Sequence, residues 1–180
     1  MKFTETKLKG AWLVEIQKIE DERGFFGRAW CRKEFEDKGL NANIKQLNTS
    51  FSNQKGTLRG MHYQADPFQE VKFVRCIQGR IFDVMVDLRP ESPTFLQWDG
   101  YELSAENGRM LYVPERFATG FLTLEDNCGM YYTTTEFYAP DAARGIRYND
   151  PAVGVEWPAE ITDISDIDRD RPDLDPENLH

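Results

Sequence analysis

EVKFVRCIQGRIFDVMVDLRP, residues 70–90, carries the clearest β-sheet pattern in the chain. It holds two short apolar-rich runs that are separated by Gln78-Gly79. The second run alternates between two sets, Phe82, Val84, Val86 and Leu88 on one side and Asp83, Met85 and Asp87 on the other. Such period-two alternation predicts a strand with one buried face. Gln78-Gly79 then predicts a hairpin turn between the two strands.

Similar short segments continue along the chain, each bounded by turn residues such as Asp99-Gly100 and Asn107-Gly108. They cover residues 95–103, 110–113, 120–124, 130–137 and 145–148. Strands at spacings of about 8–12 residues are typical of a sandwich, a jelly roll or a barrel. Helix is scarce, and we expect only two short peripheral helices, at 32–38 and near 159–164.

The length of 180 residues predicts one domain, 1–180, with a sizeable core. The net charge of −9 argues against a nucleic-acid partner. The tail from about residue 160, rich in Asp and Pro, holds eight acidic and two basic residues, so it contributes −6 of that −9. The body of the chain is therefore nearly balanced, and an anionic small ligand is not excluded.

The three cysteines, Cys31, Cys76 and Cys128, are widely spaced and form no CxxC pair. They predict reduced thiols rather than a disulfide framework or a zinc ribbon. The N-terminal MKFTETKLKG has no apolar signal core, and no apolar run is long enough to span a bilayer. We therefore expect a soluble cytoplasmic protein with no membrane segment.

His62, in Arg59-Gly60-Met61-His62-Tyr63-Gln64, is the only histidine in the body of the chain, since the other is the C-terminal His180. An imidazole-based metal site needs two or three converging histidines, so we expect no metal. The sequence also contains no nucleophile elbow and no glycine-rich phosphate loop. General acid–base catalysis remains, with His62 as the natural base. The alternative is a histidine that is simply packed at the end of a strand.

A histidine base needs a carboxylate that orients it and an acid on the other side of the substrate. The residues alone leave several candidates open: Asp83, Asp87 and the tail aspartates as orienting groups, and Tyr131, Tyr132 and Tyr138 as acids. Lys72 alternates with Val71 and Phe73. Its ammonium either points into a cavity or leaves the stem to cover apolar surface.

Several segments in fixed order resemble the dTDP-4-dehydrorhamnose 3,5-epimerase family over roughly residues 10–172. The matching segments are DERGFF (21–26), QLNTS (46–50), GTLRGMHYQ (56–64), GRIFDVMVDLR (79–89), SPTF (92–95), LSAEN (103–107), NDP (149–151) and WP (157–158). One such block would be weak, but the ordered set is highly specific.

The resemblance implies an all-β, cupin-type jelly roll, usually a homodimer in which N-terminal strands are exchanged. It implies no metal and no organic cofactor. The family reaction inverts carbons 3 and 5 of a 4-keto-6-deoxyhexose on a nucleoside diphosphate. The keto group acidifies the C–H bonds on both neighbouring carbons, so a base can remove a proton and an acid can return one to the opposite face.

The resemblance also implies roles for individual residues. His62 matches the family's base, Asp168 the carboxylate that orients it, Tyr132 the acid and Lys72 the cation beside the keto oxygen. Contacts to the nucleotide and the diphosphate are implied for Arg23, Phe26, Arg28, Gln46, Asn48, Arg59 and Tyr138.

Five positions depart from the family pattern, and one of them is Thr133, which replaces the lysine that often follows the acid. Thr119 stands where the family usually has a histidine at the sugar, and Arg28, Ala143 and Ile167 replace Glu, Glu and Lys on the nucleotide side. Two further interpretations follow from these departures: an epimerase that inverts C3 or C5 only, and an epimerase of a CDP- or GDP-linked keto sugar. A non-catalytic sugar-nucleotide-binding protein on the same scaffold is a third.

Overall fold

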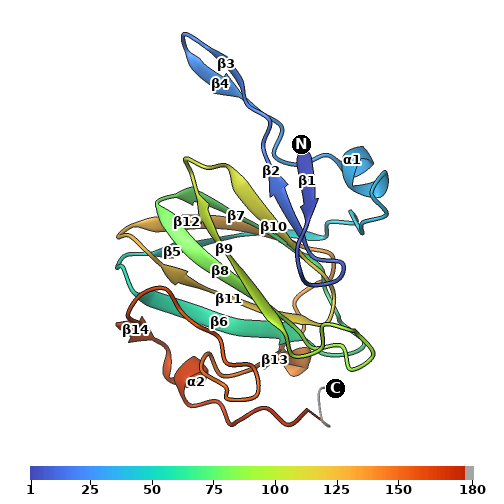
Figure 1. Cartoon of the computed structure of the whole chain (residues 1–180), viewed down its shortest axis with the longest axis vertical. Helices are drawn as coiled ribbons and strands as arrows, with labels where there is room; N and C mark the ends of the chain where they lie inside the picture. The colour runs from blue at the N-terminus through green and yellow to red at the C-terminus, as the bar shows by residue number, and fades with distance from the viewer. Residues whose placement is uncertain (177–180) are drawn as a thin grey trace.

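Two antiparallel sheets face each other in the computed structural model of the protein, which describes residues 1–176 (Figure 1). The first sheet has the order β1 (Lys2–Glu5), β2 (Trp12–Glu15), β10 (Arg109–Val113), β7 (Lys72–Gln78), β12 (Cys128–Thr134) and β5 (Gln46–Ser52). The second has the order β13 (Ala143–Gly145), β6 (Thr57–Gln64), β11 (Phe117–Thr123), β8 (Arg80–Asp87) and β9 (Trp98–Ser104), and β14 (Asp163–Ile164) pairs with β6 in parallel. This arrangement confirms the predicted jelly roll.

The predicted hairpin at Gln78-Gly79 is wrong. β7 pairs with β10 and β12 in the first sheet, whereas β8 pairs with β9 and β11 in the second. The chain crosses between the sheets at Gly79, whose φ of 70° suits glycine. A turn signal therefore marked the end of a strand correctly, but it carried no information about which sheet the next strand joins.

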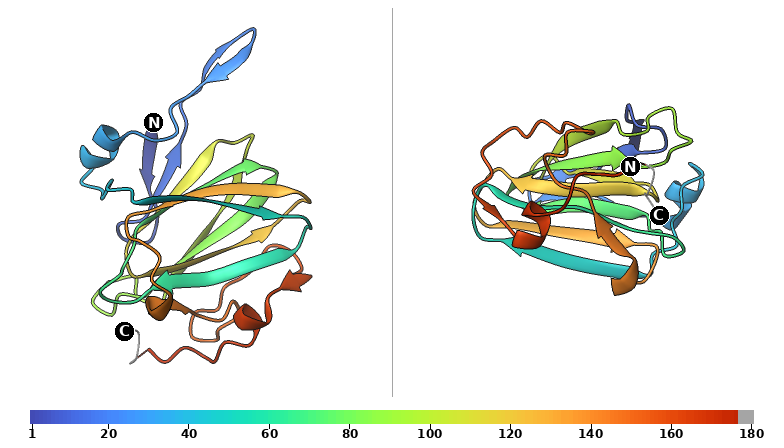
Figure 2. Two further views of the ribbon diagram at one scale, coloured as in Figure 1. Left: turned by 180° about the vertical axis from the view of Figure 1, so that it is seen from behind. Right: turned by 90° about the horizontal axis from the view of Figure 1, so that it is seen from below.

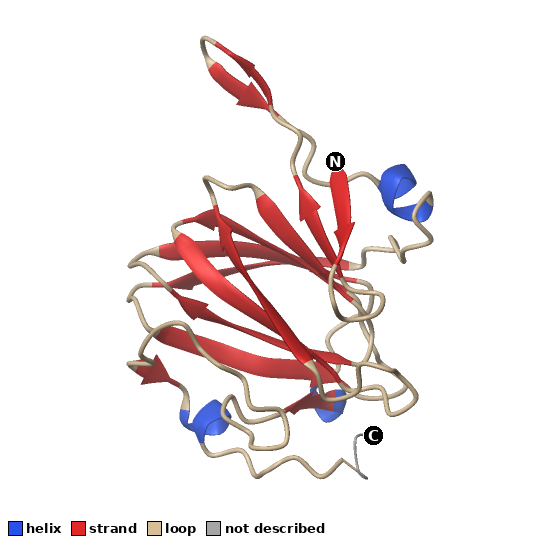
Figure 3. Ribbon diagram, in the orientation of Figure 1, coloured by secondary structure: helices blue, strands red, loops and turns tan. Residues whose placement is uncertain are grey.

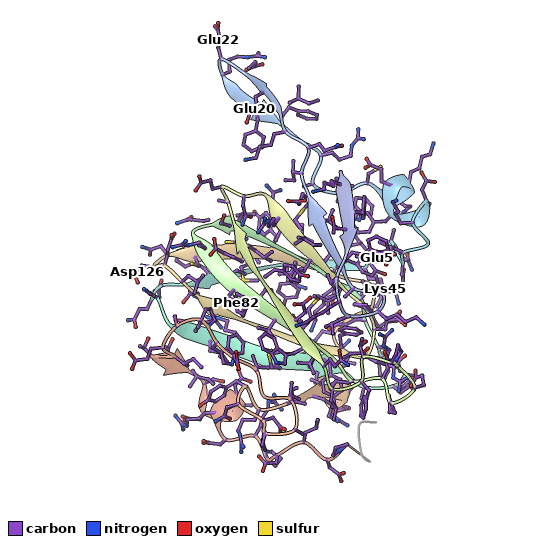
Figure 4. All side chains as sticks on the ribbon, viewed as in Figure 1. Glu5, Glu20, Glu22, Lys45, Phe82 and Asp126 are labelled. Atoms are coloured by element: carbon purple, nitrogen blue, oxygen red, sulfur yellow. The ribbon has the colours of Figure 1, made fainter. Side chains whose placement is uncertain are left out.

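The prediction of one buried face for β8 is also wrong, because both faces are buried. Val84 and Val86 pack in a cluster that includes Ile146, and the ring of Phe82, whose position is labelled in Figure 4, lies edge-on to Trp157. These contacts come from the segment after β13, which runs across the outside of the second sheet (Figure 2). Asp83 and Met85 point the other way, between the two sheets.

The helices are short and peripheral, as predicted (Figure 3). α1 (Arg32–Glu36) lies within the expected range and buries Phe35 against the first sheet, and a single 3-10 turn, η1, spans Pro140–Ala142. The helix expected near 159–164 is wrong: that stretch ends in β14, and α2 (Asp166–Arg169) follows it. Ser165 caps α2 by accepting a hydrogen bond from the Asp168 backbone N–H at 3.2 Å. This cap holds Asp168 against β6.

One hairpin, β3 (Ile19–Asp21) with β4 (Gly24–Phe26), projects far from the two sheets, with Glu22 at its outer end (Figures 1 and 4). Its large apolar side chains are exposed, and the ring of Phe26 has 69% of its surface open. The end of the acidic tail, with Glu177 and His180, lies outside the described residues. Within residues 1–176 no helix is long and apolar enough to cross a membrane.

Candidate active site

A cavity of about 950 Å³ opens between the two sheets. Its walls include nine residues that the sequence singled out: Gln46, Asn48, Arg59, His62, Lys72, Thr119, Tyr132, Tyr138 and Asp168. They come from β5, β6, β7, β11, β12 and the segments after β12 and β14, so residues far apart in the sequence meet at one place.

The wall of the cavity carries an imidazole–carboxylate pair. His62 Nε2 lies 2.7 Å from Asp168 Oδ1, and the Gly60 backbone N–H donates to Asp168 Oδ2 at 3.4 Å. Burial would raise the pKa of Asp168, but the hydrogen bond and charge of His62 outweigh it and hold that pKa below its usual value. The ionised carboxylate can only accept, so we assign the proton to Nε2. Nδ1 is then the basic nitrogen.

Lys72 reaches the same cavity from the facing sheet. Its ammonium donates to the His62 carbonyl oxygen at 3.3 Å and lies 3.2 Å from Glu70 Oε1. The side chain is largely buried, with 13% of its surface exposed. Of the two alternatives that the sequence left open for Lys72, the structure therefore supports the cavity.

Tyr132 lies on β12, in the sheet opposite His62, and its ring also lines the cavity. Burial, and to a smaller extent the charge of Glu70, raises the pKa of its phenol above the usual value. The phenol is therefore protonated at neutral pH. A molecule between the sheets would have an imidazole on one side and a phenol on the other.

Thr119 is paired with His62 in the register of β11 and β6. Its hydroxyl lies 2.9 Å from Asp83 Oδ1 and 2.9 Å from the Val84 carbonyl oxygen. Asp83 is fully buried, and burial raises the pKa of its carboxyl to about 7, against smaller opposing effects of Thr119 and Lys72. It does not contact His62, so Asp83 is not the orienting carboxylate.

A second group of polar residues lines another part of the cavity. Arg59 is held by hydrogen bonds from its guanidinium to the Ser52 hydroxyl at 3.2 Å and the Phe51 carbonyl at 3.3 Å. Gln46 accepts a hydrogen bond from the Tyr138 backbone N–H at 2.9 Å. The Tyr138 ring is exposed, with 65% of its surface open, so it is free to stack on a planar group.

Three predicted substrate-binding residues do not line this cavity. Arg23 and Phe26 lie on the projecting hairpin, and the Arg23 guanidinium pairs only with Asp21 in the described chain. Arg28 lies beyond the hairpin and pairs with Glu34 at 3.0 Å. The single chain therefore does not bring these three side chains to the remaining site residues.

Some cavity residues were not anticipated. Glu70 could have been found from its spacing, because it lies two residues before Lys72 and so faces the same side of an extended chain. Arg144 and Arg171 carry no such signal; Arg171 Nε comes within 3.6 Å of Asp168 Oδ1 only because the tail folds back over Gly145. Among residues 1–176, no cluster of three or more His, Cys, Asp or Glu side chains is placed to hold a metal ion.

Comparison with known proteins gives a consistent result. The sequence profile of the family described as dTDP-4-dehydrorhamnose 3,5-epimerase matches residues 5–176. The dTDP-4-dehydrorhamnose 3,5-epimerase of Methanothermobacter thermautotrophicus is 44% identical over 171 residues, which cover 93% of this chain and 91% of that protein.

Two solved structures show how far the likeness extends. The dTDP-4-dehydrorhamnose 3,5-epimerase of Bacillus anthracis, with TDP and pyrophosphate bound, superposes with a TM-score of 0.92 at 42% identity and covers 96% of this chain and 99% of its own. A 3′-monoepimerase of Streptomyces bikiniensis, in complex with dTDP-quinovose, superposes with a TM-score of 0.86 at 31% identity and covers 93% of this chain and 85% of its own.

Proposed function

Because the chain belongs to the dTDP-4-dehydrorhamnose 3,5-epimerase family, whose members are cupin-type jelly-roll isomerases, we propose that its cavity inverts carbons 3 and 5 of dTDP-4-dehydro-6-deoxy-D-glucose. The observation that carries this proposal is a base and an acid on facing sheets of one cavity, namely His62 held by Asp168 and the protonated phenol of Tyr132. Inversion of a carbon requires removal of a proton from one face and delivery to the other.

Each inversion then takes two proton transfers. Nδ1 of His62 removes the proton next to the ketone, the C–H electron pair becomes the enolate, and Asp168 stabilises the resulting imidazolium. Lys72 lowers the energy of the enolate oxygen by its positive charge. Tyr132 gives its proton to the opposite face of the carbon, and the ketone re-forms. His62 then releases its proton to solvent and Tyr132 takes one up, and the same cycle at the second carbon completes the reaction.

The nucleotide occupies the part of the cavity near Tyr138. Arg59 binds the diphosphate, since a guanidinium pairs well with phosphate oxygens. Gln46 and Asn48 supply amide groups for the base, and the exposed ring of Tyr138 stacks on it. Ala143 lines the cavity, and its small side chain leaves room for a base other than thymine. Ile167 is exposed and is not among the residues that line the cavity.

Solvent deuterium incorporation tests the reaction directly. We would incubate the protein with dTDP-4-dehydro-6-deoxy-D-glucose in heavy water and locate deuterium at C3 and C5. We expect deuterium at both carbons. No incorporation with this sugar or with its CDP- and GDP-linked forms would refute an epimerase and favour a protein that only binds sugar nucleotides.

An enzyme that inverts one carbon is a second candidate, favoured by the Thr119 site. Thr119 is hydrogen-bonded to Asp83 and cannot carry positive charge, so the environment of the sugar differs from the usual family pattern. The fold does not separate the candidates, because a 3′-monoepimerase also superposes over most of the chain. Deuterium at one carbon only would identify this activity.

The projecting hairpin supports a homodimer that completes the site. Arg23 and Phe26 lie away from the cavity of their own chain, with 90% of the Arg23 side chain exposed. On the outer face of the first sheet, Leu47, Phe51 and Tyr131 expose large apolar surface. A second copy would cover this surface while the exchanged hairpins carry Arg23 into the partner's cavity.

Mixing two inactive variants tests whether the hairpins are exchanged between subunits. The His62→Ala and Arg23→Ala proteins are each expected to catalyse deuterium exchange only weakly when assayed alone. If Arg23 acts across the interface, a randomly mixed dimer contains one complete site, so mixing recovers about a quarter of wild-type exchange. If Arg23 serves its own chain, no complete site can form and mixing recovers nothing.

A cytoplasmic location is part of the same proposal. All three cysteines are free thiols, and Cys76 and Cys128 are buried, which agrees with a reducing compartment.

A further inference from the structure

Asp83 is a buried carboxyl for which the proposed reaction has no role. It lines the sugar side of the cavity with Lys72, Thr119 and Tyr132, yet only 1% of its surface is exposed. No ion pair to Asp83 occurs within residues 1–176, whereas charged groups that are fully buried are usually paired. The state of this carboxyl therefore affects the charge of the whole cavity.

The hydrogen bonds around Thr119 favour one protonation state. The Thr119 oxygen lies 2.9 Å from both Asp83 Oδ1 and the Val84 carbonyl oxygen, but a hydroxyl has one proton. With Asp83 ionised, two acceptors compete for that proton. With Asp83 protonated, the carboxyl donates to Thr119, Thr119 donates to Val84, and every proton has an acceptor.

The neighbouring charges do not compensate for an ionised Asp83. Lys72, whose charge acts on the Asp83 carboxyl, already pairs with Glu70 at 3.2 Å. Other charged or titratable groups of the cavity wall are His62 with Asp168 on β6 and α2, Arg59 on β6, which is held by Ser52 and Phe51, and Tyr132 on β12. Tyr101 on β9 is paired with Asp83 in the sheet register, and its hydroxyl donates to Asp99. Burial also raises the pKa of the Asp83 carboxyl to about 7.

We propose that Asp83 works as a neutral carboxylic acid whose proton is held by Thr119, and that its ionisation switches enolate formation off. An ionised Asp83 would share the cavity with the enolate and repel it, cancelling part of the stabilisation by Lys72. The effect on the reaction rests on the proposed epimerase function. The protonation state itself is a property of the free protein.

Two measurements test the proposed protonation state of Asp83 and its effect on the reaction. In carbon-13 NMR of the free protein, with the Asp83 carboxyl assigned by through-bond spectra, we expect a neutral carboxyl at pH 6 that titrates near 7. An Asp83 already ionised at pH 5 would overturn the proposal. This experiment needs no substrate and no variant, so it gives an answer even if the epimerase function fails.

Deuterium exchange across pH 6–8 tests the consequence. We expect wild-type exchange to fall above pH 7 by up to about tenfold for each pH unit. Asp83→Asn, which copies the neutral acid, should stay within about tenfold of wild type at pH 6 and lose this fall. Tyr132 does not produce the same fall, because burial raises the pKa of its phenol above the usual value and the phenol stays protonated across this range. A loss of more than about a hundredfold at pH 6 in a folded, nucleotide-binding Asp83→Asn protein would mean that the carboxylate is required, and the proposal would be wrong.

Discussion

Replacing Asp83 by Asn should change the pH dependence of folding stability. The carboxyl has a pKa of about 7 in the folded protein and an ordinary value of 3.8 when exposed. Below pH 3.8 it is protonated in both states, so folding carries no penalty. Between these values only the unfolded chain ionises, so the unfolded state gains stability as pH rises. Above about pH 7 both states are ionised and the penalty is constant.

The size of this effect follows from the difference between the folded and unfolded pKa values of Asp83. At about 1.4 kcal/mol for each pH unit, ionisation of Asp83 costs about 4 kcal/mol by pH 8. Asn keeps the shape and can donate to Thr119, but it does not titrate. The free energy of unfolding of Asp83→Asn, relative to wild type, should therefore rise by about 4 kcal/mol between pH 4 and pH 8.

Urea unfolding at fixed protein concentration measures this difference at each pH. Asp87→Asn is a matched control, since Asp87 lies on the same strand and is equally buried. Burial would raise the pKa of Asp87, but hydrogen bonds from Arg89, Ser92 and Thr94 outweigh it and hold that pKa below the usual value. Below about pH 4 only the folded Asp87 is ionised, so the stability difference between wild type and this variant should grow as pH rises to about 4 and stay constant from about pH 5 to pH 8. Parallel curves for wild type and Asp83→Asn would refute the reasoning.

Three further substitutions test the catalytic site and the close packing of the strands that carry it. His62→Ala should reduce exchange by at least about 10²–10⁴-fold with little change in melting temperature, because 46% of the side chain is exposed; a loss that merely tracks stability would indicate a packing role. Asp168→Asn should also impair exchange, because it disturbs the tautomer and orientation of the imidazole, and unchanged deuterium incorporation would contradict this assignment. Gly120→Ala would place a methyl group 2.7 Å from the Arg59 carbonyl oxygen and should cost about 1–3 kcal/mol in urea unfolding, whereas Gly129→Ala, with no neighbour closer than 3.4 Å, should cost clearly less.

Local sequence patterns predicted segments that overlap β7 to β13, because alternation along a strand depends only on which side chains are buried, but they did not predict β1 to β6 or β14. The 130–137 and 110–113 segments became β12 and β10 with small shifts of their ends. The same patterns could not assign strands to sheets. β7 and β8 are both apolar-rich and separated by a turn residue, which suits a hairpin as well as a crossing between sheets.

The candidate site also combines features that the sequence predicts with features that depend on the folded chain. His62 and the lack of metal-binding, nucleophile and phosphate-loop motifs narrowed the chemistry to proton transfer, and the ordered motifs pointed to a family and so to Lys72 and Tyr132. His62 and Asp168 are 106 residues apart, and their contact requires β14 and α2 to fold onto β6. The neutral state of Asp83 has no local signature at all, because it arises from complete burial and from a hydroxyl on another strand. Side-chain identity is local, whereas solvent exclusion and long-range contacts are properties of the folded chain.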